Sequence, residues 1–214
     1  MKNSLLKILI FILIVSSMLF AVSCGGNGNE RESKIESQPD LGQTLEDQDL
    51  ANYYWVATSD KTCTITGVKD TSVTDVRIPS CVTKIEDGVF ENCENIQRVY
   101  SPSIEAWCNI EFVMDNYATS NPLVMPYVYS GYETNSVEFY INEELVTDLV
   151  IPSTVKKIKV CAFATYGRLK SVIIRDSVKT IGDYAFASCY NLENVRFGGG
   201  ITSIGGGLLV HAQV

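Results

Sequence analysis

The sequence predicts a β-rich repeat solenoid, in which short parallel strands stack into a curved sheet. The first observation behind this prediction is an internal period of about 23 residues, because Val155–Ile158 returns as Val178–Ile181 and again as Ile201–Ile204. The second is a V-x-I-like alternation at the end of each unit, which is typical of strands with one buried face. A fixed period of this length is the signature of architectures in which each unit packs on its neighbours.

An earlier copy of the unit lies upstream, separated from the others by an insertion. Val82 and Phe90 repeat the register of Val155 and Phe163 further along the chain. The gap between these two copies leaves room for one further unit and an insert, which we place at about residues 101–145. Within the insert, Ser101-Pro102-Ser103 predicts the start of a short helix that carries Trp107 and Phe112 and packs the insert onto the solenoid.

A period of about 23 residues falls in the range of leucine-rich repeats, where each unit contributes one short strand. Pro79 and Pro152 follow two of the expected strands directly, and proline suits a strand exit because it cannot donate a ladder hydrogen bond. The rest of each unit turns back and fills the core with phenylalanine. The expected strands are Val73–Ile78, Val146–Ile151, Leu169–Ile174 and Leu192–Phe197.

The units VKTIGDYAFASCYNLENVRF and VTKIEDGVFENCENIQRV resemble BspA-type leucine-rich repeats, whose pattern is roughly V-x-x-I-G-x-x-A-F-x-x-C-x-x-L-x-x-V-x-I-P. The resemblance covers about residues 60–209 and includes the insert. It implies a BspA-type solenoid of ~23-residue repeats, a curved parallel sheet with an inserted helix and hairpin, and a role in adhesion. Cys161 and Tyr166 depart from the pattern, and the last unit, from Ile204, is incomplete. We expect either a truncated product or an end that pairs with something.

The chain begins with a segment typical of export signals. Lys2 and Lys7 precede the mostly aliphatic run Ile8–Val22, which is short for a membrane span. Ser23-Cys24 then resembles the processing site of bacterial lipoproteins, although an ordinary signal peptidase would cut the same bond and an uncleaved anchor is a further alternative. We therefore predict a signal peptide at 1–23, a flexible tether at 24–50 with Cys24 lipidated, and a repeat domain at 51–214.

Composition disfavours nucleic-acid partners. Removing residues 1–23 deletes two lysines and no acids, which takes the formal net charge from −8 to −10. Such a surface repels phosphate backbones.

Catalytic and metal-binding patterns are missing from the sequence, and we predict a non-enzyme without cofactors. His211 is the sole histidine and lies near the end of the chain, where a general base would be poorly held. The glycine runs at 198–200 and 205–207 lack the context of phosphate-binding loops, and no Cys-x-x-Cys pair or calcium loop occurs.

The remaining cysteines and the start of the domain have structural interpretations. Cys93 and Cys189 occupy the cysteine position of the repeat and should act as small buried hydrophobes, although a disulfide joining Cys93 to Cys108 stays open. Tyr54–Ala57 and Cys63–Gly67 predict a small hairpin that caps the N-terminal end.

The candidate binding site is the strand face that points away from the core. Arginine, tyrosine, aliphatic and small polar side chains of this kind are common in partner-binding patches, although a plain solvated face would look the same. The predicted outward residues are Asp75, Arg77, Arg98, Tyr100, Asp148, Val150, Ser171, Ile173, Asn194 and Arg196.

These observations predict an exported, lipid-anchored protein at the cell envelope or outer surface. We expect protein or glycoprotein ligands, bound during adhesion to host or neighbouring-cell macromolecules, with the lipid anchor as the membrane contact and no small-molecule substrate. The alternatives are a non-catalytic envelope scaffold or a truncated fragment of a longer adhesin, and a hydrolase that works through paired carboxylates is a third.

Overall fold

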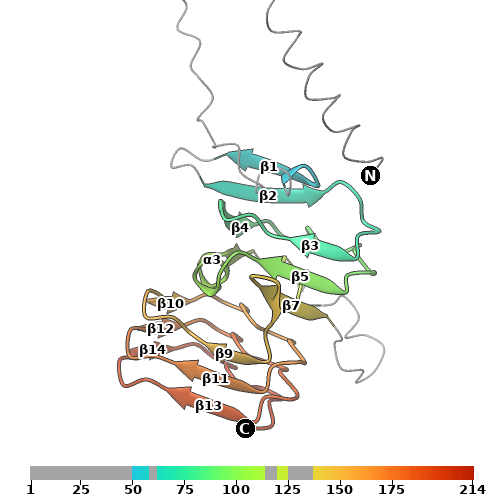
Figure 1. The fold of residues 1–214 in the computed structure, drawn as a ribbon. Coiled ribbons are helices and arrows are strands. Elements are labelled where there is room, and N and C mark those ends of the chain that lie inside the picture. The colour runs from blue at the N-terminus through green and yellow to red at the C-terminus, as the bar shows by residue number, and fades with distance from the viewer. Residues whose placement is uncertain (1–49, 58–61, 114–119, 125–136) are drawn as a thin grey trace, which may run out of the picture. The chain divides into compact units, whose positions relative to one another are not determined.

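The computed structural model describes residues 50–57, 62–113, 120–124 and 137–214. These residues form a β-solenoid in which successive coils stack along one axis, with very little helix (Figure 1). The predicted fold class is confirmed. The predicted signal peptide, Cys24 and residues 25–49 of the tether lie outside the described residues, and Leu50, at the domain boundary, is already buried in the core.

The N-terminal end is covered by an antiparallel hairpin, as the sequence predicts. Strand β1 (Tyr53–Ala57) pairs with β2 (Cys63–Val68), and a bulge falls between Tyr54 and Trp55. Strand β2 then pairs in parallel with β4 (Val82–Ile85), and β4 pairs with β6 (Glu111–Phe112). The hairpin therefore starts the sheet on which the later coils stack, and it supplies the buried side chains of Cys63 and Ile65.

A second sheet in the N-terminal half is formed by one short strand from each coil. It runs in the order β3 (Asp75–Arg77), β5 (Arg98–Ser101), β7 (Glu138–Ile141) and β8 (Glu144–Leu145), with β8 antiparallel to β7. Val76, Val99 and Phe139 are in register across the three parallel strands and all point into the core. The hairpin β7–β8 is the second half of the predicted insert.

The C-terminal half repeats strictly, with each strand paired in parallel to the equivalent strand of the next unit. One sheet contains β9 (Asp148–Val150), β11 (Ser171–Ile174) and β13 (Asn194–Phe197). Together with β3, these strands fall within the four strand segments predicted from the sequence. The C-terminal half has a further sheet, which contains β10 (Lys157–Ile158), β12 (Thr180–Ile181) and β14 (Ser203–Ile204). The sequence analysis did not predict these strands. Such short strands cannot show an alternation, so the sequence offers no signal for them.

Stacked phenylalanines fill the core between the two sheets. The rings of Phe163 and Phe186 lie 5.3 Å apart and nearly parallel, at an interplanar angle of 4°. Phe139, which lies in the insert, meets Phe163 edge to face, with ring centroids 6.3 Å apart and planes at 67°. All three side chains are buried, which confirms the predicted role of phenylalanine in the core.

The insert is fastened to the repeats by its helix. Helix α3 (Ile104–Asn109) begins after Ser103, whose hydroxyl accepts a hydrogen bond from the backbone N–H of Ala106 at 3.0 Å. Trp107 is fully buried and donates from Nε1 to the carbonyl of Ala162 at 2.8 Å. The prediction that Phe112 shares this helix was wrong, because the backbone becomes extended at Ile110 and Phe112 lies on β6.

Left-handed backbone recurs at an equivalent position in four of the described units. The residue three after the unit's isoleucine has positive φ in Gly88, Cys161, Tyr184 and Gly207. Only two of these are glycine, although the conformation costs other residues free energy. Coil-to-coil hydrogen bonds offset that cost, since Cys161 N–H donates to Asp183 O at 3.0 Å and Tyr184 N–H to Gly206 O at 2.9 Å. The departure of Cys161 from the repeat pattern is thus accommodated by the stacking.

Tyr166, which stands where the repeat has cysteine, connects the β7–β8 hairpin to the C-terminal coils. Its hydroxyl donates to Val146 O at 2.6 Å and accepts from Phe139 N–H at 3.4 Å. Burial raises the pKa of this phenol to about 12, so it remains a donor at any physiological pH. The tyrosine that replaces the repeat's cysteine therefore holds the insert against the C-terminal coils through these two hydrogen bonds.

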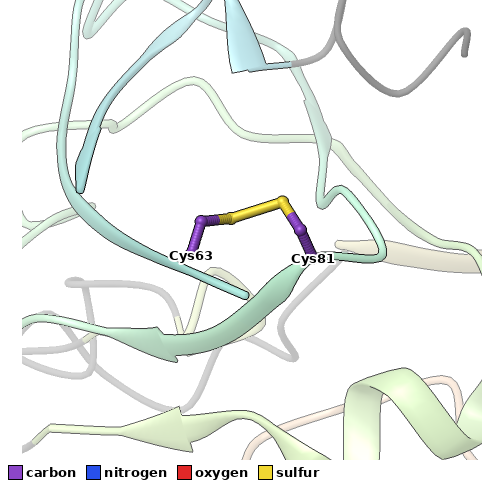
Figure 2. Close-up of a disulfide and its surroundings, with 2 residues drawn as sticks. All are labelled: Cys63 and Cys81. Atoms are coloured by element: carbon purple, nitrogen blue, oxygen red, sulfur yellow. A yellow bond between two sulfur atoms is a disulfide. The ribbon is translucent and has the colours of Figure 1, made fainter. Parts of the chain in front are cut away.

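The cysteines divide into one disulfide and four free thiols among the described residues. Cys63 and Cys81 are bonded across β2 and the start of β4, with their Cα atoms 5.3 Å apart (Figure 2). The pairing of Cys93 with Cys108 left open by the sequence is absent, since both are free and buried. Cys189 is fully buried, as expected, and burial raises its pKa to about 12, so it is an unreactive thiol.

Candidate interaction face

The ten residues predicted to point outward all lie on strands and none is buried. Seven are exposed, whereas Arg98, Tyr100 and Ser171 are half-buried. Their neighbours along each strand, such as Val76, Val99 and Val172, are buried. The register derived from the sequence is therefore the register of the structure, while the binding role of these residues remains a prediction.

In the N-terminal sheet, the outward residues form two rows that run across the strands. Asp75, Arg98 and Glu138 are in register in the first row. The Nε atom of Arg98 lies 2.6 Å from a carboxylate oxygen of Asp75, and Arg168 reaches Glu138 at 3.2 Å. The hydrogen bond to Asp75 raises the pKa of Arg98. This row therefore carries two separate ion pairs, both partly exposed.

The second row, Arg77, Tyr100 and Tyr140, stacks face to face, and we call it the ladder. The guanidinium carbon of Arg77 lies 3.9 Å from the ring centroid of Tyr100, which is a cation–π contact. The rings of Tyr100 and Tyr140 are stacked, with centroids 4.9 Å apart and planes at 18°. The ladder is thus a fixed arrangement of the two residue types that most often dominate interfaces besides tryptophan.

Acidic residues hold both ends of the ladder. Glu143, in the turn between β7 and β8, accepts two hydrogen bonds from Arg77 at 2.7 and 3.4 Å. The hydrogen bond from Arg77 lowers the pKa of Glu143. At the other end, the hydroxyl of Tyr140 donates to Glu138 at 2.8 Å, which raises the pKa of Tyr140. These partners fix the side chains in place before any ligand arrives, which reduces the entropy lost on binding.

A shallow groove of about 170 Å³ lies beside the ladder. It is lined by aromatic and proline side chains together with hydroxyl and amide groups. Its lining residues are Arg77, Ile78, Pro79, Ser80, Tyr100, Ser101, Pro102, Tyr140, Asn142 and Glu143.

The sheet of β9, β11 and β13 has the same strand geometry, and its outward side chains make fewer contacts with one another. Asp148, Ser171 and Asn194 share one row, in which the hydroxyl of Ser171 donates to Asp148 at 2.5 Å. This hydrogen bond, followed by one from Thr147, lowers the pKa of Asp148. In the other row, Val150 and Ile173 are exposed at 42% and 39%.

Sequence reasoning missed four residues of the N-terminal face: Glu138, Tyr140, Glu143 and Arg168. The strand that carries Tyr140 follows its neighbour Tyr100 after much more than one repeat length, because the insert intervenes. A search at the repeat period therefore cannot align them. The alternation Val137, Phe139, Ile141 against Glu138 and Tyr140 was the available signal.

Two further properties bear on function. In the parts of the chain that the structure describes, no helix has the length and apolar character needed to cross a membrane. The same parts contain no group of three histidine, cysteine or acidic side chains placed to hold a metal ion. His211 is exposed in the last turn.

Comparison with protein families decides the family. The model of the BspA type leucine rich repeat region matches six copies, over residues 67–112 and 134–211. The chain belongs to the BspA-type leucine-rich repeat family. This confirms the resemblance inferred from the sequence. No curated protein matches the chain.

Several solved structures are similar to this BspA-type chain. A leucine-rich repeat protein of T. pallidum is 19% identical, with a TM-score of 0.42, over 75% of this chain and 86% of that one. A leucine-rich cell surface protein of Faecalibacterium prausnitzii is 16% identical, with a TM-score of 0.30, over 71% and 76%. A leucine-rich repeat protein of Bacteroides ovatus is 17% identical, with a TM-score of 0.31, over 76% and 56%. We draw no functional conclusion from these likenesses.

Proposed function

We propose that this chain is an exported, lipid-anchored cell-surface protein that binds protein or glycoprotein partners and mediates adhesion. Membership of the BspA-type leucine-rich repeat family supports a binding scaffold. The signal-like segment before Cys24 supports export and lipidation. The observation that carries the binding role is the ladder on the outward face of β3, β5 and β7, where Arg77, Tyr100 and Tyr140 stack beside a groove.

The mechanism we propose is rigid contact across strands. The repeat places each outward side chain at a fixed register, so a partner meets a preformed surface and not a flexible loop. The ladder contributes the large side chains at the centre, and the ion pair of Arg98 with Asp75 borders it. Exposed ion pairs of this kind add little affinity, and they set orientation and salt dependence.

The test is a binding measurement with the mature chain against a panel of purified host extracellular-matrix proteins and neighbouring-cell surface extracts. Arg77→Ala, Tyr100→Ala and Arg196→Ala are combined in one variant. Saturable binding that falls by at least about tenfold in this variant, equivalent to ~1.4 kcal/mol, supports the proposal. The circular dichroism spectrum and the unfolding midpoint establish that the variant is folded.

A control variant matched in charge and in tyrosine content tests whether the effect depends on position. Lys157→Ala, Lys179→Ala and Tyr184→Ala delete two positive charges and one exposed tyrosine away from the outward face. We expect this control to bind as the parent does. Equal loss in both variants would show that net charge governs binding, and absence of any partner for the folded chain would favour the envelope scaffold.

A further inference from the structure

Strand β1 presents an exposed apolar surface that the binding face does not explain. Tyr54 is 59% exposed, Trp55 36% and Val56 58%, and the adjacent Ala57 is exposed as well. The strand is the outer member of its sheet, so one of its edges faces away from β2 (Figure 1). Successive side chains alternate between the two faces of a strand, so Tyr54 and Val56 lie on one side of the free edge of β1 and Trp55 on the other. An outer strand flanked by large apolar side chains would promote aggregation unless something covers it.

The ring of Tyr54 is held in a defined position. It lies across Gly67 of β2, where a Cβ atom added to the glycine would stand 3.2 Å from the ring. The ammonium group of Lys69 lies 5.8 Å from the centre of the same ring and donates to Ala51 O at 2.7 Å. These contacts with Gly67 and Lys69 hold the exposed ring of Tyr54 in one position.

Chain connectivity indicates what lies next to this surface. The segment from Cys24 to Tyr54 spans at most about 100 Å when fully extended. Among the described elements, β1 is the strand with the shortest chain path to the proposed lipid anchor. Any bilayer that receives that anchor is within reach of Tyr54 and Trp55.

We propose that the β1 surface, formed by Tyr54, Trp55 and Val56, rests in the interfacial layer of the lipid bilayer that holds the Cys24 anchor. This inference rests on the proposed lipidation of Cys24. Tyrosine and tryptophan favour that layer because each combines an apolar ring with a polar group that remains hydrated. Lys69 beside Tyr54 suits the same position, with its stem along the ring and its ammonium group in water.

Charge indicates that this contact is apolar and not electrostatic. The mature chain has a formal net charge of −10, so anionic lipid headgroups repel the domain as a whole. We therefore expect contact on zwitterionic vesicles to equal or exceed contact on anionic ones. The contact would hold the repeats at a fixed orientation to the membrane.

The two tryptophans allow a direct test. Trp55 is exposed on β1, whereas Trp107 is fully buried and serves as an internal control. The mature chain lipidated at Cys24 is reconstituted into phosphatidylcholine vesicles, with and without bromine atoms on the acyl chains. Brominated lipid should quench the emission of the parent, and Trp55→Phe should remove the quenched component and leave the Trp107 emission unchanged.

A second variant and a flotation assay separate this inference from the proposals on which it rests. Phe197→Ala changes a side chain of β13 that is 45% exposed at the other end of the domain, and it should leave the quenching as in the parent. Vesicle flotation without quenching of Trp55 would overturn the inference while the anchor stands. Failure to float would remove the anchor and the inference together, and shielding of Trp55 that depends on protein concentration without lipid would assign the surface to a second copy.

Discussion

The two outward faces differ in chemistry although they share one geometry. On β3, β5 and β7, the ladder of Arg77, Tyr100 and Tyr140 is held at both ends by carboxylates. On β9, β11 and β13, the matching rows hold small polar and aliphatic side chains and the single arginine Arg196, and one hydrogen bond joins Ser171 to Asp148. The half interrupted by the insert therefore carries the larger, mutually stacked side chains, and the proposed binding role rests on these.

The insert is what makes this difference possible. It supplies β7 with Tyr140 and the turn with Glu143, and its helix supplies Trp107, which anchors it to the C-terminal coils. Arg77 and Glu143, which are far apart in sequence, thus come into contact through the insert. A solenoid built from uninterrupted, equal units would place only equivalent positions side by side.

The largest expected effect comes from removing the junction between the two halves. Trp107→Ala deletes a fully buried ring that packs on Phe139 at 4.6 Å and on Phe112 at 5.3 Å. We expect the free energy of unfolding to fall by about 3–5 kcal/mol, as for other buried aromatic truncations. Urea unfolding should also become two-step, because repeat coils interact only with their neighbours.

Phe186→Ala, inside the regular coils, is the control for this prediction. It should cost a similar free energy and leave the junction between the halves in place. Loss of less than about 1 kcal/mol in Trp107→Ala would show that the insert is not what couples the two regions.

The disulfide stabilises only the N-terminal half. Replacing Cys63 and Cys81, at a sequence separation of 18, with alanine opens the loop between them and should cost about 3 kcal/mol. Hydrogen exchange should show lost protection in β1, β2 and β4 and unchanged protection in β11 and β13. Cys189→Ala in the regular half, which removes a buried sulfur atom and its hydrogen bond to Phe163 O, should cost about 1 kcal/mol. Uniform loss of protection would contradict this division.

Close stacking in the regular half makes several glycines sensitive to substitution, and Gly182 is one of them. A Cβ atom on Gly182 would lie 2.5 Å from the backbone nitrogen of Val160, so Gly182→Ala should cost about 1–3 kcal/mol in thermal or urea unfolding. At Gly199 the nearest atom, Oδ1 of Asp176, would be 4.0 Å away, and Gly199→Ala should change stability by less than about 0.5 kcal/mol. Equal effects would mean that the coils are not stacked as described.

The smallest effects concern the carboxylates on the two faces. Arg77 lowers the pKa of Glu143 from its ordinary value of 4.5, and Ser171 lowers that of Asp148 from 3.8. Because both pKa values are lower in the folded state, the stability they contribute is present above the ordinary values and is lost as the pH falls through the folded values. In NMR titrations, Arg77→Met should raise the pKa of Glu143 alone, and Ser171→Ala that of Asp148 alone.

The sequence predicts the regular half well because one rule governs it. The shift of one repeat that aligns Val172 with Val195 also aligns their outward neighbours, so strand positions and side-chain directions follow together. The insert does not obey that shift, and this is why Tyr140 and Glu143 were missed and Phe112 was placed on the helix. The Cys63–Cys81 disulfide was also missed, since pairing depends on the separation of Cα atoms, which sequence spacing does not give.

The most direct test of the binding account compares the affinities of two double variants for a captured matrix protein. One variant combines Arg77→Ala with Tyr100→Ala on the ladder, and the other combines Ile173→Ala with Arg196→Ala on the regular face. We expect the first to weaken binding by at least about tenfold and the second by much less. Equal weakening would spread the site over both faces, and unchanged binding in the ladder variant would contradict the assignment of the ladder as the binding surface.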